Sequence, residues 1–169
     1  MKNLLLLFIV LMISCSKEEQ SKQINQMVMA NFDLSFSFYL QNNKGDDLLE
    51  PGSSTAYKRN EIKLFKDPEL KEDVTREYTP NGEEDLVHGP HEKGYMLFIF
   101  PNMSTPISGG NFENILYLQL AESDVDTLNI QVTEMNNGAY ISKFVYNETI
   151  IFDFNDAQFD FNWNKVIVK

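Results

Sequence analysis

Apolar and polar residues alternate with a period of two along most of the chain beyond residue 31. Successive side chains of a strand lie on opposite faces, so each such run predicts a strand with one buried face. The runs 95–100 and 115–120 are apolar at nearly every position, which indicates central strands covered on both sides. The predicted strands are 32–40, 61–64, 95–100, 115–120, 128–133, 140–146, 149–154, 159–163 and 166–168.

The connections between the later runs have the composition of tight turns. Asn137–Gly138 separates two runs, and both residues tolerate the positive φ of a hairpin turn. Asn147–Glu148 and Asn155–Asp156 stand in the corresponding places between the next runs. We therefore expect residues 115–168 to form an antiparallel meander.

Helical periodicity is weak throughout, and residues 70–74 are its only faint candidate. The fold predicted for residues 31–169 is all-β, a single antiparallel β-sandwich of about 8–9 strands, with a barrel as the alternative. We expect Trp163 to be largely buried. The expected core includes Phe36, Leu64, Leu97, Ile99, Leu118, Ile130, Phe144, Phe152 and Phe161.

The first 14 residues have the pattern of an export signal. Lys2 precedes an unbroken apolar run of nine residues, Leu4 to Met12. That run is too short to cross a bilayer core of ~30 Å as a helix, so it predicts a signal peptide rather than a transmembrane anchor. The segment is interpreted below as a lipoprotein signal, and the alternative is an ordinary signal peptide followed by an incidental cysteine.

Ile13, Ser14 and Cys15 follow the apolar run, and together they resemble the lipobox of bacterial lipoproteins, with Met12 where Leu is more usual. The resemblance implies removal of residues 1–14 and lipidation of Cys15. Cys15 is the only cysteine, so the chain can form no internal disulfide, and lipidation would consume the thiol. Several acyl chains on one residue hold a protein stably at a membrane.

Residues 15–30 are predicted to be the lipidated cysteine and a flexible tether, which would reach about 20 Å. The acidic pair Glu18–Glu19 resembles the surface-export signal of Bacteroidetes lipoproteins, although charge in a linker also serves solubility. We expect an outer-membrane lipoprotein exposed at the cell surface, with a periplasm-facing location as the alternative.

Composition excludes several classes of protein. An apolar fraction of 43% and an aromatic fraction of 12% exclude a disordered chain. The formal net charge of −11 argues against a nucleic-acid partner, because phosphate binding needs a basic face. We expect a monomer without a cofactor.

Two groups of residues have side chains of the kind that bind metal ions. His88 and His91 lie among carboxylates, and these ligands suit zinc or copper, but the segment is also what an acidic solvated loop would contain. Asp153, Asp156 and Asp160 superficially resemble a calcium loop that lacks its glycine. Strand alternation explains these aspartates better, and the prediction is no metal site.

A second resemblance covers most of the mature chain. The turn from Gly45 to Gly52, the strand start Asp126–Thr127–Leu128, the tip Tyr146–Asn147 and the closing 166–169 are together similar to small Bacteroidetes surface lipoproteins. That family has no assigned function, so it supplies no catalytic residues. Asp126–Thr127–Leu128 also resembles an O-glycosylation acceptor of that phylum, the alternative being a strand start at which Asp126 caps a turn.

These observations favour a non-catalytic binding module for a glycan or a partner protein of the envelope. A structural or assembly subunit of a surface complex is the alternative, and an enzyme is third, since no catalytic motif is present. Ligand contacts are expected from the connections 66–93 and 101–113, or from exposed Tyr57 and Tyr78. Within 66–93 we expect a short strand at 74–78. A strand edge is a further way to accept a partner.

Overall fold

The computed structural model describes residues 35–79, 82–100, 106–107, 111–135, 138–155 and 165–169. The predictions for the signal peptide, Cys15, the tether, Asp156, Phe161 and Trp163 concern residues outside these ranges, and they stay predictions.

The described residues form ten strands and two short 3-10 helices, η1 (Arg59–Glu61) and η2 (Thr75–Glu77). The strands are β1 (Phe36–Gln41), β2 (Lys63–Phe65), β3 (Val87–His91), β4 (Gly94–Ile99), β5 (Pro106–Ile107), β6 (Asn111–Ala121), β7 (Asp124–Met135), β8 (Gly138–Tyr146), β9 (Thr149–Asp153) and β10 (Lys165–Val168).

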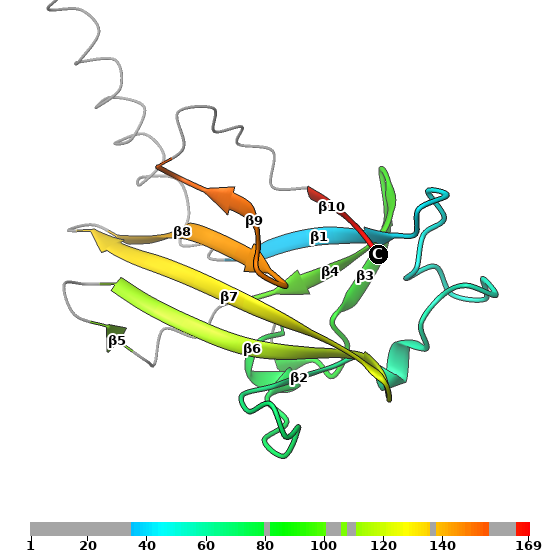
Figure 1. Cartoon of the computed structure of the whole chain (residues 1–169), viewed down its shortest axis with the longest axis horizontal. Helices are drawn as coiled ribbons and strands as arrows, with labels where there is room; N and C mark the ends of the chain where they lie inside the picture. Colours follow the sequence, from blue (N-terminus) through cyan, green and yellow to red (C-terminus); the bar gives the residue numbers. More distant parts are fainter. Residues whose placement is uncertain (1–34, 80–81, 101–105, 108–110, 136–137, 156–164) are drawn as a thin grey trace, which may run out of the picture.

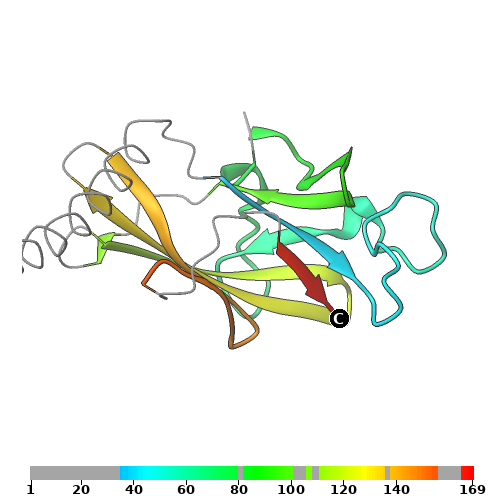
Figure 2. The same ribbon diagram turned by 90° about the horizontal axis from the view of Figure 1, so that it is seen from above.

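The strands form two sheets, as the sequence predicted for a β-sandwich. The smaller sheet has the order β10-β1-β4-β3, and the larger has the order β2-β6-β7-β8-β9, with β5 paired to β6 (Figure 1). In Figure 2, β1, β3 and β4 lie on one side of the molecule and β6 and β7 on the other. The all-β fold class is therefore confirmed.

Aromatic side chains join the two sheets through the core. Phe36 and Phe38 of β1 lie with ring centroids 4.6 and 5.6 Å from that of Phe144 in β8. Seven of the expected core residues are buried, and Phe152 is partly buried and packs against the same core. The seven buried residues are Phe36, Leu64, Leu97, Ile99, Leu118, Ile130 and Phe144.

The predicted meander is confirmed from β6 to β9 and wrong after β9. Each of these strands pairs antiparallel with the next, and Asn147 and Glu148 turn the β8–β9 hairpin with φ of 45° and 68°. Strand β10 instead belongs to the smaller sheet, where it pairs with β1 in parallel. Alternation identifies a strand but not its partner, so the one parallel pair between named strands was not foreseen.

Residues 66–93 contain two further departures from the prediction. The expected strand at 74–78 is wrong, because Thr75–Glu77 forms η2 and Tyr78 closes it by donating its amide to the Thr75 carbonyl. A bridge between Phe65 and Asp73 then covers the outer edge of β2. Strand β3 was missed because Gly89–Pro90 interrupts its apolar pattern.

The turn between Gly45 and Gly52 contributes two buried leucines to the core. Leu48 and Leu49 are buried, and Asp47 accepts hydrogen bonds of 2.8 Å from the amides of Leu49 and Tyr95. A Cβ on Gly94 would lie 2.3 Å from Oδ2 of Asp47, so this close approach requires glycine. The turn is thereby fixed to the β3–β4 hairpin.

Candidate functional site

A groove of about 710 Å³ opens on the surface beside η1, β2 and η2. The long connection 66–93 supplies more than half of its lining. Ligand contact by this connection stays a prediction. Three cations and four carboxylates line the groove, together with Asn60, Ile62, Val74 and Thr75. The charged residues are Arg59, Lys63, Arg76, Asp73, Glu77, Glu84 and Asp85.

Each cation of the groove lining has a carboxylate partner in the same lining. Arg59 Nε lies 2.6 Å from Asp85, and Lys63 Nζ lies 3.1 Å from Asp73. Arg76 forms an ion pair with Glu84, and these two side chains are 68% and 74% exposed. Pairs this exposed contribute little to stability, so a ligand can exchange them for its own charges.

Thr75 is the only hydroxyl of the groove lining, and its hydrogen-bonding capacity is used within the fold. Its Oγ1 donates to Asp73 at 2.7 Å and accepts the amide of Leu64 at 3.0 Å. Burial alone would raise the pKa of Asp73, but the hydrogen bonds from Thr75 and the charge of Lys63 outweigh it and lower that pKa. The Thr75 hydroxyl is therefore committed to Asp73 and to the Leu64 amide.

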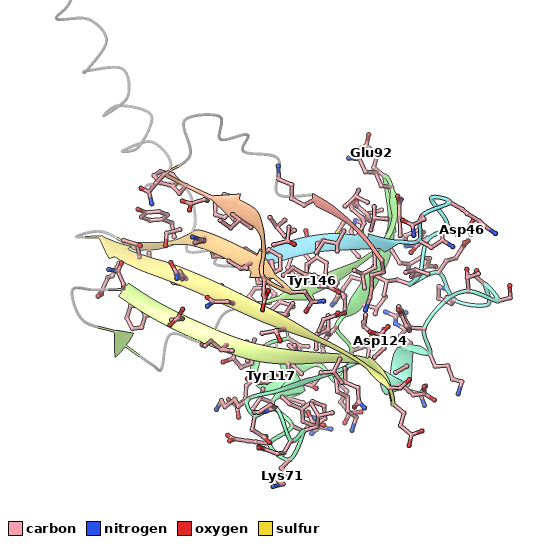
Figure 3. The ribbon with its side chains drawn as sticks, viewed as in Figure 1. Asp46, Lys71, Glu92, Tyr117, Asp124 and Tyr146 are labelled. Carbon is pink, nitrogen blue, oxygen red and sulfur yellow. The ribbon has the colours of Figure 1, made fainter. Side chains whose placement is uncertain are left out.

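A second charged cluster lies at the end of the sandwich where β7 begins and β10 ends. Asp124 and Asp126 of β7 face Lys169, whose Nζ lies 2.6 Å from Asp124 and 2.5 Å from Asp126. Tyr57 donates to Asp124 at 2.5 Å, and Tyr146 donates to Asp126 at 2.5 Å. Figure 3 labels Asp124 and Tyr146, which lie close to the end of β10.

We call this second cluster the lysine clamp (Tyr57, Asp124, Asp126, Tyr146 and Lys169). Asp126 and Tyr146 are buried, and the other three residues are partly buried. The side chains of Asp126 and Lys169 are only 4% and 17% exposed. Burial, followed by the hydrogen bond and charge of the neighbouring aspartate, raises the pKa of both tyrosines.

Asp124 has the opposite shift. Its burial works toward a higher pKa, but hydrogen bonds from Lys169 and Tyr57 and the charge of Lys169 lower the pKa overall. The clamp thus keeps the Asp124 carboxylate charged and its tyrosines neutral.

The two tyrosines expected to be exposed are not. Tyr78 is 2% exposed, and its hydroxyl donates to the buried Asn114 at 3.1 Å. Tyr57 packs partly buried against the core. Both predictions of exposed contact residues are therefore wrong. Each ring packs against the core, and each hydroxyl has a polar partner there, Asp124 for Tyr57 and Asn114 for Tyr78.

The two histidines lie on one strand but not in a common site. His88 is half-buried and its ring contacts Phe98 at 5.7 Å between centroids, whereas His91 is exposed at the β3–β4 turn. Within the part of the chain that the structure describes, no three His, Cys, Asp or Glu side chains are placed to hold a metal ion.

The partners of Asp153 lie within its own hairpin and the turn that follows it. It lies in β9, pairs with Lys143 at 3.4 Å and accepts the amide of Asn155 at 3.0 Å. Asp156 and Asp160 lie outside the described residues.

Thr127 is exposed on β7, while its neighbour Asp126 is buried. Asp126 is the third residue of β7 and binds the side-chain amide of Asn147, a turn residue of another hairpin, at 2.5 Å. Modification of Thr127 stays a prediction.

The lysine clamp was missed by reasoning from the sequence, although one signal was present. Asp126 has the same phase as Leu128, Ile130 and Val132, so alternation places this carboxylate on the buried face. A charge in that position requires a buried partner. Nothing local indicates that Lys169 is that partner.

Comparisons with protein-family models, curated proteins and solved structures gave no match for this chain. Among the described residues, no helix has the length and apolar character needed to cross a bilayer.

Proposed function

We propose that this chain is a lipid-anchored lipoprotein of the outer membrane and a non-catalytic binding module. The groove beside η1 and η2 is the proposed binding site. Its lining of paired and exposed arginine, lysine and carboxylate groups is the observation that carries the proposal. The anchor is proposed from the lipobox resemblance at Cys15.

A protein partner fits this groove better than a glycan does. Arginine is enriched at protein interfaces, and a partner with its own charged side chains can replace the exposed pairs of Arg76 and Glu84. The groove lining contains no aromatic side chain on which a sugar ring would stack. A glycan is therefore the alternative outcome of the test.

The test is capture from native envelope membranes by the full chain, with a glycan array run in parallel. We expect a stoichiometric protein partner that Arg76→Glu no longer captures. Lys71→Glu is the matched control, because it makes the same charge change on an exposed residue that does not line the groove. Capture that is absent, or equal for both variants, contradicts the proposal. Saturable glycan binding lost only in Arg76→Glu would instead assign the groove to a glycan.

The anchor has a separate test. Mass spectrometry of the natively expressed protein should find a mature N-terminus at an acylated Cys15, and Cys15→Ser should release the protein from the membrane fraction. An unmodified chain that begins elsewhere would contradict it.

A further inference from the structure

Strand β3 is an edge strand of the smaller sheet and adjoins the groove. Among the described strands it pairs with β4 alone, so its other side is a sheet edge (Figure 1). Phe98 donates its amide to the Leu86 carbonyl at 2.9 Å, and the register places Val87 opposite Leu97. In an antiparallel ladder, the residue next to such a hydrogen-bonded pair directs its N–H and C=O away from the neighbouring strand. Val87 therefore directs both backbone groups to the edge.

Two charged side chains bind these backbone groups of Val87. Oδ1 of Asp85 accepts the Val87 amide at 3.0 Å, and the guanidinium of Arg59 donates to the Val87 carbonyl. The other carboxylate oxygen of Asp85 lies 2.6 Å from Arg59 Nε, so the two side chains also bind each other. Together they present one acceptor and one donor to Val87, as the backbone of a neighbouring strand would. We call Arg59 and Asp85 the edge cap.

The edge cap covers the regular part of the β3 edge. Beyond it, Pro90 has no amide, and the register with β4 shifts between His88 and His91. The other strand beside the groove, β2, is closed by main chain, because Val74 donates its amide to the Leu64 carbonyl at 2.8 Å. Side chains thus close the β3 edge in the way that a backbone segment closes the β2 edge.

We propose that the edge cap prevents β3 from pairing with β3 of a second copy of this chain. An uncovered strand edge offers its backbone groups to other edges, and two copies of one edge can pair antiparallel about a two-fold axis. Both side chains of the cap are 42% exposed, and ion pairs this accessible add little stability. The cap therefore acts by excluding a strand rather than by holding the fold together.

Removal of both cap side chains tests the proposal. Arg59→Ala with Asp85→Ala removes one charge of each sign, so the net charge stays at −11 and general repulsion between copies is unchanged. We expect this alanine variant to dimerise with a dissociation constant about ten-fold or more below that of the wild type, which is roughly the effect of one hydrogen bond to the freed backbone. Sedimentation equilibrium of the full chain, in the same detergent for every variant, measures the dissociation constant.

The matched control removes a neighbouring ion pair of η1. Lys58 Nζ lies 2.7 Å from Glu61, and among the described residues neither side chain binds a strand backbone. Lys58→Ala with Glu61→Ala also leaves the net charge unchanged, and it should keep the wild-type dissociation constant. A third variant, Arg59→Gln with Asp85→Asn, removes both charges but keeps a donor and an acceptor near Val87. It should associate less than the alanine variant.

Hydrogen exchange at the Val87 amide locates the contact. In the wild type Asp85 accepts this amide, so its exchange should be slow at every protein concentration. In the alanine variant it should be fast in dilute protein and slow in concentrated protein, because β3 of a second copy then accepts the amide. Nuclear magnetic resonance resolves this single amide.

Five results overturn the proposal. They are an alanine variant that associates no more than the wild type, equal association by the control, equal association by the glutamine–asparagine variant, a dimer in which the Val87 amide still exchanges fast, and an alanine variant that no longer folds. The last result would mean that the cap holds the fold together. Capture of a partner, and its loss in Arg76→Glu, bears on none of these outcomes, so the proposed function fails or stands separately.

Discussion

The groove and the lysine clamp contain the same kinds of charged group and differ in burial. In the groove, Arg76 and Glu84 pair with most of their side-chain surface exposed to water. In the clamp, Lys169 and Asp126 pair with almost all of theirs removed from water. Water solvates Arg76 and Glu84 whether or not they form an ion pair. Lys169 and Asp126 have little access to water, so each charge depends on the other as its partner. The groove charges are therefore accessible from solvent, whereas the clamp charges are committed to the fold.

Removal of the clamp cation should have the largest effect on stability. Lys169→Met leaves two carboxylates without their cation, one of them buried, and we expect a loss of about 3 kcal/mol in the free energy of unfolding, measured by urea denaturation. The triple variant with Asp124→Asn and Asp126→Asn should recover part of that loss, because no uncompensated charge remains. A loss below about 0.5 kcal/mol would mean that Lys169 contributes no more to stability than an exposed ion pair, and it would contradict the prediction.

The tyrosines of the clamp should make stability sensitive to alkaline pH. The pKa of Tyr146 is raised in the folded chain, first by burial and then by Asp126, so the unfolded chain ionises first. The stability that this group contributes is present below pH about 10 and is lost as the pH rises further. Tyr146→Phe should cost about 1 kcal/mol at neutral pH and flatten the decline above pH about 10, as followed by urea midpoints. An unchanged slope would contradict the shift.

Acid should weaken the clamp through Asp124. Its folded pKa is lowered, so its contribution is present above the unfolded value of about 4 and is lost as the pH falls through the folded pKa. The stability difference between the wild type and Asp124→Asn should therefore narrow as the pH falls below about 4, measured by denaturation at several pH values. The groove residue Asp73 shifts in the same direction, so Asp73→Asn is the matched comparison. A constant difference across this range would refute the linkage.

The exposed groove pair should give the smallest effect on stability. Arg76→Ala is expected to change the free energy of unfolding by about 0.5 kcal/mol or less, and 0.5 M NaCl should abolish even that difference. The same variant should lose partner capture. A large destabilisation would mean that the groove pair, like the clamp, serves the fold.

Much of the fold follows from local pattern, because burial of every second residue in a strand is visible in the sequence. The expected core residues that the structure describes are buried or partly buried, and Asn147–Glu148 turns the β8–β9 hairpin at the place where a turn was expected. The sequence predicted that the 66–93 connection lies at the surface, and seven of the eleven residues that line the groove belong to it. The other four, from Arg59 to Lys63, were not expected at a site.

The contacts that only the tertiary structure decided join residues that are far apart in the chain. Tyr57 and Asp124 are 67 positions apart, and Lys169 is 45 and 43 positions from its two carboxylates. The parallel pairing of β10 with β1 likewise depends on which sheet edge is open, and alternation within β10 is the same for any partner. The sequence by itself determined which face of each alternating strand is buried. Only the packed sheets decided which buried charges meet, because that depends on register and topology rather than on neighbouring residues.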